Sequence, residues 1–138
     1  MKYKYAIVLA FAVVVMASYS YAARINQPDL SVTDIGFVQL QNCNSTNATK
    51  YVNVQVTMYV TNSGNATAYN FTDRMVIAGT TYNFAVSSLA AGANTQHMQT
   101  VSRACRQQFS VNATADIYNS VAESNEANNN RIETFTPI

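Results

Sequence analysis

The sequence predicts an all-β domain, built as a sandwich of two antiparallel sheets with six or seven short strands. Three observations support this prediction. Apolar and polar residues alternate with the period of a strand over most of the chain after its first 22 residues. Clusters of Gly, Asn, Ser and Ala interrupt the alternating runs. No amphipathic helix of useful length occurs between them, and this combination is typical of a two-sheet sandwich.

The first 22 residues have the layout of a secretory signal peptide. Lys2 and Lys4 form a positive start, Ala6 to Ala17 is an unbroken apolar run, and Ser18 to Ala22 supplies small residues for cleavage after Ala22. The run is shorter than the roughly 20 residues that span a membrane. We therefore predict a cleaved signal peptide at 1–22, with an uncleaved apolar helix that acts as an anchor as the alternative.

The remaining residues, 23–138, suffice for one domain with one core. Without Lys2 and Lys4, six of the eight basic residues remain against seven acidic ones. A surface with nearly equal numbers of basic and acidic residues lacks the excess of positive charge that is typical of nucleic-acid-binding proteins. Together with the leader, it predicts a secreted or cell-surface protein that does not bind nucleic acid and that meets a membrane only through an uncleaved N-terminal segment.

The first two strands differ in regularity. Leu30, Val32 and Ile35 mark an opening strand whose phase slips by one residue, as at a β-bulge. Val52 to Thr61 alternates without a break, which predicts a half-buried strand with one apolar face. The turn Asn62-Ser63-Gly64-Asn65 follows it.

The later strands are shorter or less regular. Thr95 to Val101 is polar, which indicates an edge strand or a strand packed on a partner. The other predicted strands are Tyr69 to Ile77, Tyr82 to Val86, Phe109 to Ile117 and Ile132 to Thr136, with turns at Ala78-Gly79-Thr80 and Ala90 to Asn94.

The cysteines Cys43 and Cys105 predict one disulfide, because thiols of exported chains are usually paired. Such a cross-link would stabilise the fold by about 4 kcal/mol; two unpaired buried thiols are the alternative. In a seven-strand immunoglobulin-like order, the two residues fall in the A–B and E–F connections, at the same end of the sandwich. With His97 as the single histidine and no C-x-x-C spacing, a zinc site is not expected.

Five N-x-[ST] triplets indicate N-glycosylation. Their asparagines fall in predicted loops or on outward-facing strand positions, so each can carry a sugar; the alternative is that they are only polar surface residues. The five are Asn44, Asn47, Asn65, Asn70 and Asn112.

Oxygen-bearing side chains gather between the last two predicted strands, and such a set can bind Ca²⁺. The spacing is not that of an EF-hand, and no glycine marks a tight ligand cradle. We favour a loop whose Asn and Glu side chains bond its own backbone amides, and expect no cofactor, with calcium as the alternative. The residues are Asp116, Asn119, Glu123, Glu126 and Asn128.

No catalytic residues are predicted, and the chain is not expected to be an enzyme. His97 lies among polar residues without a placed nucleophile, so we interpret it as a surface histidine. Tyr59 falls on the polar face of its strand, where an exposed ring could contact sugar or protein or pack at the sheet rim.

Four segments in order make the chain resemble the CARDB family, the cell-adhesion-related domain of bacteria and archaea. The late segment, with its V-x-E-S-N-E-x-N-N signature, is the most specific. The segments are Pro28 to Ile35, Val60 to Ala66 (V-x-N-x-G-x-A), Ser88 to Ala93, and Asp116 to Asn129. This chain departs from the family in its cysteine pair, its single copy and its polar Thr95 to Val101 region.

The resemblance implies a seven-strand, immunoglobulin-like sandwich over 23–138. Domains of this family occur in secreted and surface-attached proteins, and the family as a whole does not imply a particular ligand or reaction. We expect a non-enzymatic adhesion or binding module whose partners are surface proteins, glycans or copies of itself. The first alternative is a filament or pilus subunit that donates a free N-terminal strand, Ala23 to Val38, to its neighbour. A pilin-like subunit that retains its apolar helix is the second.

Overall fold

A computed structural model describes residues 26–43 and 50–138. The predicted leader and the triplets at Asn44 and Asn47 lie outside these ranges. Within them the chain forms seven strands and no helix. Consequently, the described part contains no helix that could span a membrane.

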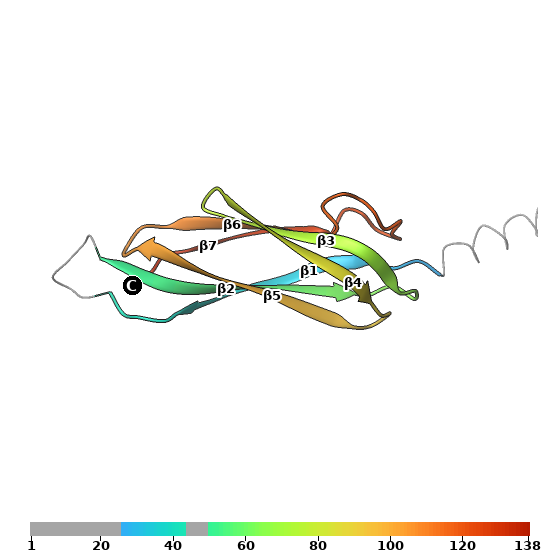
Figure 1. Cartoon of the computed structure of the whole chain (residues 1–138), viewed down its shortest axis with the longest axis horizontal. Coiled ribbons are helices and arrows are strands. Elements are labelled where there is room, and N and C mark those ends of the chain that lie inside the picture. Colours follow the sequence, from blue (N-terminus) through green and yellow to red (C-terminus); the bar gives the residue numbers. More distant parts are fainter. Residues whose placement is uncertain (1–25, 44–49) are drawn as a thin grey trace, which may run out of the picture.

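The seven strands form two antiparallel sheets that lie face to face (Figure 1). The three-stranded sheet has the order β1-β2-β5 and the four-stranded sheet the order β4-β3-β6-β7. The strands are β1 (Leu30–Gln39), β2 (Tyr51–Asn62), β3 (Ala68–Ile77), β4 (Thr80–Leu89), β5 (Asn94–Ala104), β6 (Phe109–Thr114) and β7 (Asn130–Phe135). The all-β prediction and its two sheets are confirmed.

A two-residue turn keeps β4 in a hairpin with β3. Ala78 and Gly79 both have positive φ angles, 47° and 84°, which is the backbone of a tight hairpin whose twist matches that of its strands. In constant-type immunoglobulin order the fourth strand would join the first sheet. Here it stays beside β3, so the strands divide into three and four.

Local irregularities agree with the sequence at two places and differ at a third. The β1–β2 register shifts between Val32 and Asp34, as the predicted bulge requires. β5 is an edge strand, in agreement with its polarity. The sixth strand, however, ends at Thr114 rather than Ile117, because Asp116 adopts a φ of 41° and starts a turn.

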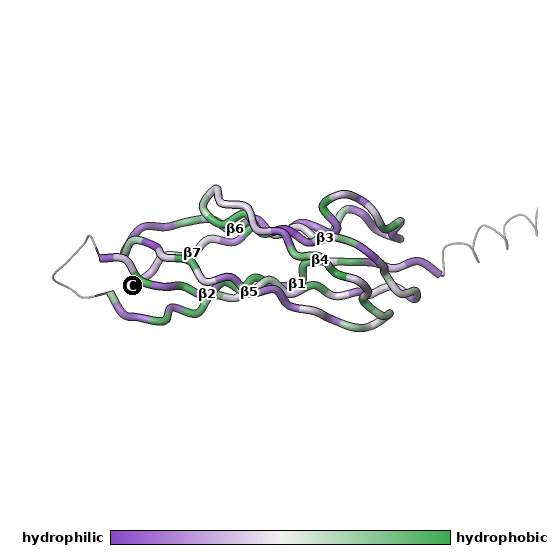
Figure 2. Tube along the Cα trace, viewed as in Figure 1, coloured by the Kyte–Doolittle hydropathy of each residue, from purple (hydrophilic) through white to green (hydrophobic). Residues whose placement is uncertain are grey.

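The core lies between the sheets and is built from the apolar residues of each alternating run. Along β2, for example, Val52, Val54, Val56, Met58 and Val60 are all buried, and hydropathy alternates along the tube in Figure 2. Three rings pack together in one half of the core: Phe37 stacks on Phe135 at 4.9 Å, and both meet Phe109 edge-on.

The chain enters the sandwich at one end and reaches its C-terminus at the other (Figure 1). We call these ends the N-terminal end, near Asn26, and the disulfide end. The first strand is not free, contrary to the expectation for strand donation. β1 pairs with β2 from Leu30 to Gln39, and Leu30 is fully buried.

Candidate functional site

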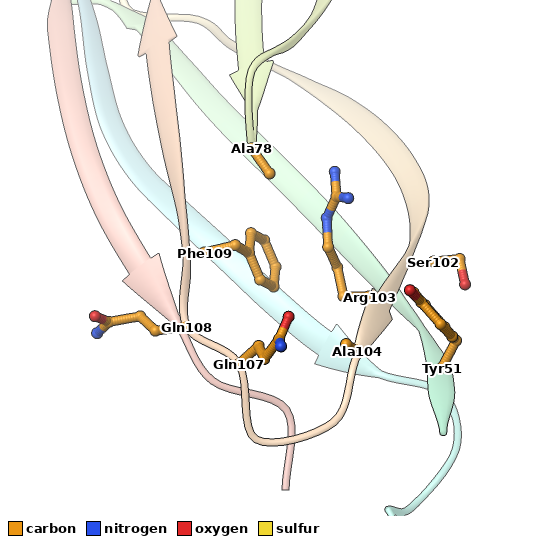
Figure 3. Close-up of a pocket in the computed structure, with 8 residues that line it drawn as sticks. All are labelled: Tyr51, Ala78, Ser102, Arg103, Ala104, Gln107, Gln108 and Phe109. Carbon is orange, nitrogen blue, oxygen red and sulfur yellow. The ribbon is translucent and has the colours of Figure 1, made fainter. Parts of the chain in front are cut away.

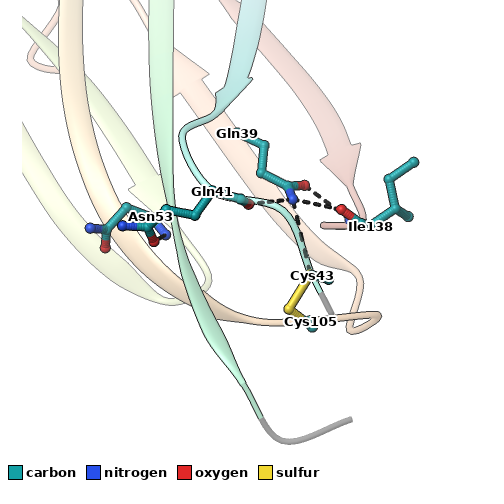
Figure 4. The surroundings of a disulfide bond; sticks show 6 residues. All are labelled: Gln39, Gln41, Cys43, Asn53, Cys105 and Ile138. Carbon is teal, nitrogen blue, oxygen red and sulfur yellow. Dashed lines mark hydrogen bonds between the residues drawn. A yellow bond between two sulfur atoms is a disulfide. The ribbon is translucent and has the colours of Figure 1, made fainter. Parts of the chain in front are cut away.

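The expected disulfide joins Cys43 to Cys105 at the disulfide end (Figure 4). Cys43 lies in the β1–β2 connection and Cys105 directly follows β5, and their Cα atoms are 5.7 Å apart. The two connections therefore meet at the same end of the sandwich, as the strand order predicted.

Hydrogen bonds tie the segment after β7 to both cysteine-bearing connections. The Cys43 amide donates to the Ile138 carbonyl (3.3 Å), and the Arg106 amide donates to the Pro137 carbonyl (2.8 Å). The Gln39 side chain donates to Ile138 and accepts from its amide. This framework fixes the backbone at the disulfide end.

A cavity of about 270 Å³ opens beside this framework, between the end of β5 and the start of β6 (Figure 3). Figure 3 shows the Arg103 side chain and the Phe109 ring facing one another, with Gln107 pointing between them and Gln108 pointing away. Tyr51 lies at the rim. The full lining is Tyr51, Ala78, Ser102, Arg103, Ala104, Gln107, Gln108 and Phe109.

Arg103 is the charged residue of the cavity. Its Nη2 donates to the Ile77 carbonyl at 3.2 Å, and its guanidinium lies 5.4 Å from the centre of the Phe109 ring. Its buried Nε has no hydrogen-bond partner in the described part of the chain. A guanidinium has five N–H donors; Nη2 already bonds the Ile77 carbonyl and Nε is buried, so contact with another molecule would be made by the Nη groups.

The charges are separated between the two ends of the sandwich. Lys50 and Arg106 are exposed at the disulfide end, near Arg103. No carboxylate lines the cavity. Four of the seven acids lie at the opposite end, at or next to the β6–β7 connection: Asp29, Asp116, Glu123 and Glu126.

Exposed apolar side chains extend from the cavity over the outer face of the three-stranded sheet. Val38 is 53%, Leu40 52% and Tyr51 66% exposed. Tyr59 also faces outward, as predicted, and is 38% exposed. We define the disulfide-end surface as Val38, Leu40, Lys50, Tyr51, Arg103 and Arg106.

The β6–β7 connection at the N-terminal end, residues 115–129, directs its acidic side chains to backbone amides. Glu123 accepts from the Leu30 amide through Oε2, and from the Asn129 side chain through Oε1. Glu126 accepts from the Glu123 amide at 3.0 Å. These bonds attach the first residue of β1 to the connection.

The surroundings of Glu123 also shift its ionisation. Burial raises the pKa of Glu123 from its usual 4.5 to about 7, and Glu126 and Asp116 add to the rise, while the Leu30 amide and Asn129 oppose it. The buried carboxyl is therefore easily protonated near neutral pH.

Asn62 and Gly64, from the V-x-N-x-G-x-A segment, complete the N-terminal end. The fully buried Asn62 side chain accepts from the Asp29 and Gly64 amides and donates to the Ala66 and Leu89 carbonyls. A Cβ on Gly64 would lie 2.3 Å from the Gln27 carbonyl oxygen. The turn must therefore carry glycine for the entering chain to pass this close.

The proposed calcium ligands do not form a carboxylate cage. Over the described ranges, no group of three or more His, Cys, Asp or Glu side chains could hold a metal ion. Asp116 accepts from the Val121 amide at 2.7 Å, and Asn128 donates to Asp29 at 2.9 Å. Asn119 contributes its own amide to the Asp116 carbonyl. Three buried oxygens in this connection lack a donor in the structure: Oδ1 of Asp116, Asn128 and Asn129.

His97 is not a surface residue, and that expectation was wrong. It points inward from β5, with 11% of its side chain exposed, and its Nε2 lies 2.7 Å from Oδ2 of the buried Asp73 on β3. Its ring stacks on Phe84 at 4.6 Å. Asp73 also accepts from the Asp116 amide, so the pair links the two sheets, and none of its hydrogen bonds within the described residues is to a nucleophile.

The three predicted glycosylation sites within the described residues are all exposed. Asn65 lies in the β2–β3 turn and Asn112 on the outer face of β6. Asn70 has a φ of 53°, and Tyr69 beside it is exposed too, because the strand is irregular there. A shallow cavity of about 440 Å³ adjoins Asn70. Glycosylation at these positions stays a prediction.

Sequence reasoning missed both Arg103 and the His97–Asp73 pair. Val101, Arg103 and Cys105 are spaced by two residues, so in a strand their side chains face the same side, and Val101 and Cys105 are buried. The alternation therefore carried a signal that Arg103 faces inward. For Asp73, the pairing with His97 depends on how two sheets stack, and the period of a single strand does not contain that information.

Comparisons with known proteins agree on one family. The CARDB family model matches residues 27–133. The crystal structure of the CARDB domain of a Pyrococcus furiosus protein, described as in complex with di-metal ions, is 25% identical, with a TM-score of 0.61, and the match covers 81% of this chain and 94% of that one. The solution NMR structure of the same domain gives 24% identity and a TM-score of 0.59, over 82% and 97% of the two chains. No curated protein matches the chain.

Proposed function

The chain belongs to the CARDB family, and from this premise we propose that it is an exported, non-catalytic adhesion module that binds glycans of another surface through its disulfide-end surface. The observation that carries the proposal is the cluster of Lys50, Arg103 and Arg106, which has no ion-pair partner among the described residues, beside exposed Tyr51 at the disulfide end.

The composition of this surface favours sugar as the partner. Exposed tyrosine offers an apolar ring face with a polar hydroxyl, and the amides and hydroxyls around it can bond to sugar hydroxyls. The surface combines cations with a lining that has no carboxylate, so it suits a polyhydroxylated or anionic chain better than an acidic or purely apolar partner.

Export to the cell surface is supported by the leader pattern, the glycosylation triplets and the disulfide. Mass spectrometry of the native protein would test this directly. We expect a mature N-terminus at Ala23, a mass in excess of the chain's own from attached sugar, and two fewer hydrogens from the oxidised cysteines. A terminus at or near Met1 would instead favour the pilin-like alternative.

The adhesion role is tested with cells that display the full chain. Arg106→Gln should weaken attachment of these cells to a layer of the same organism by about threefold or more, because an exposed cation at a contact contributes modestly. Arg74→Gln removes the same charge on the other sheet, where Arg74 bonds Asn83, and should leave attachment unchanged. Equal losses in both variants would contradict the proposal.

Strand donation is a weaker alternative for this chain, since β1 would have to leave its own sheet. A filament subunit of that kind would polymerise when concentrated. Our proposal expects a monomer in sedimentation velocity at high concentration.

A structural cation at the β6–β7 connection is a second candidate, favoured by the buried oxygens of Asp116, Asn128 and Asn129 that lack donors. If calcium binds there, millimolar CaCl2 should raise the melting temperature by several degrees. Asp116→Asn should abolish the rise, while the amide oxygen can still accept from Val121. An unchanged melting temperature would exclude this candidate.

A further inference from the structure

The Arg103 cavity points to a defined class of ligand. We propose that it binds a carboxylate-bearing sugar unit, such as a uronic acid, with the carboxylate on the Arg103 guanidinium and the sugar ring against Tyr51. This inference rests on the proposed function and specifies the sugar that the disulfide-end surface selects.

The first argument is the state of the Arg103 charge. The guanidinium is half-buried, donates to one carbonyl, and has no acidic partner among the described residues. A charge withdrawn from water without a counter-ion is costly. An anion in the cavity would offset that cost, and a carboxylate matches the fork geometry of a guanidinium better than a spherical ion does.

The second argument is the order of the guanidinium. The centre of the Phe109 ring lies 5.4 Å from the guanidinium carbon, and Nη2 is held by its bond to the Ile77 carbonyl. Phe109 is itself held by Phe37 and Phe135. A preorganised donor loses less conformational entropy on binding than a mobile surface arginine does.

The third argument is the shape and chemistry around the charge. A volume of about 270 Å³ is at the small end of ligand cavities, so it suits a single sugar ring better than a longer peptide ligand. The Gln107 amide points into the space, and Ser102 and Tyr51 line the same opening. Amide and hydroxyl groups beside an exposed aromatic ring suit a sugar, whereas an extended acidic peptide would need a groove or a sheet edge.

The test is a calorimetric and NMR titration of the unglycosylated full chain, made in a host without the transferase. The probes are a trimer of galacturonic acid, its methyl ester, and an oligoglutamate of equal charge. We expect the acid trimer to bind at least about tenfold more tightly than the methyl ester, because the ester lacks the negative charge that the guanidinium would bond.

Three substitutions at two positions assign the site. Arg103→Gln should reduce affinity for the acid trimer at least about tenfold, and Arg103→Lys should lie between it and the native chain because lysine keeps the charge but loses the fork. Tyr51→Ala should weaken binding severalfold. Arg74→Gln serves as the matched control and should bind normally. Thermal unfolding of each variant shows that it is folded.

Several results would overturn the inference: equal binding of acid and methyl ester, native affinity in Arg103→Gln, tighter binding of oligoglutamate than of the sugar, or no binding of the trimer at all. The proposed adhesion function is judged separately, because cells displaying Arg106→Gln and Arg74→Gln report attachment without reference to this sugar.

Discussion

At the N-terminal end, one asparagine side chain, Asn62, bonds four backbone groups, and Glu123 holds the first residue of β1. At the disulfide end, Arg103 bonds one carbonyl and leaves its Nε without a partner in the described structure. The comparison teaches that the signature segments of the family hold the fold together. Recognition is therefore expected where those segments are absent.

The same contrast explains how the two ends are stabilised. The N-terminal end relies on buried polar side chains bonded to backbone, although three buried oxygens there lack donors in the described structure. The disulfide end relies on a covalent cross-link, hydrogen bonds to Ile138 and Pro137, and the Phe37, Phe109 and Phe135 cluster. Apolar packing and a disulfide do not use hydrogen bonds from nearby polar side chains. Among the described residues, none of Arg103, Lys50 and Arg106 forms an ion pair, and we propose these cations as the ligand contacts.

The largest expected effect comes from removing the covalent support of the disulfide end. Replacing both Cys43 and Cys105 by serine should lower the free energy of unfolding by about 4 kcal/mol, as expected when a loop of 62 residues loses its cross-link. Urea unfolding of the variant and the native chain measures the difference. A loss below about 1 kcal/mol would show that hydrogen bonds to Ile138 and Pro137 hold this end without the bond.

Removing the Asn62 side chain should weaken the opposite end nearly as much. Asn62→Ala removes the side-chain partner of one buried and three partly buried backbone groups, and we expect a loss of about 3 kcal/mol. Asn53→Ala is the control, in the same strand but on the partly exposed face. Similar losses in the two variants would remove the distinction between the ends.

The close passage at Gly64 provides a steric version of the same test. Gly64→Ala forces a Cβ into the backbone of residues 27–29 and should cost about 2 kcal/mol. Gly36→Ala in β1 meets only ordinary contacts with Tyr59 and Thr57. Its melting temperature should match or exceed that of the native chain, and a drop equal to that of Gly64→Ala would contradict the assignment.

Glu123 gives the N-terminal end a dependence on pH. Because the pKa of folded Glu123, about 7, lies above its usual 4.5, the protonated form favours the fold. Its contribution is complete below about pH 4.5 and is lost as pH rises through 7. The loss should be on the order of 2 kcal/mol.

Urea unfolding at pH 5 and pH 8 measures this effect against Glu123→Gln, which cannot ionise. The native chain should lose more stability than the variant over this interval, because the variant has no ionisable group at this position. Parallel curves for the two proteins would show that Glu123 keeps its ordinary ionisation in the fold.

The sequence predicted those features that depend on the alternation within a strand or on the residue types of a turn. The β1 bulge, the edge position of β5 and the cysteine pair all follow from residues near in sequence or from strand order. It failed for His97, whose partner Asp73 lies in the other sheet. It also extended β6 to Ile117, because alternation continues past Asp116 although the backbone turns there.

The candidate site was hidden from the sequence for a related reason. Arg103, Tyr51 and Phe109 come from three segments that meet only when β5 ends beside β6. Oxygen-rich residues 116–128, in contrast, are conspicuous in the sequence, but their bonds go to their own backbone and to the entering chain.

The most direct test of the central claim is an NMR titration of the isotope-labelled chain with polysaccharide released from the surface of the source cells. We predict that the largest shift changes fall on the disulfide end, at the amides of Tyr51, Arg103 and Arg106, and that residues 123–129 remain unchanged. Changes centred on residues 123–129, with none at the disulfide end, would contradict the account.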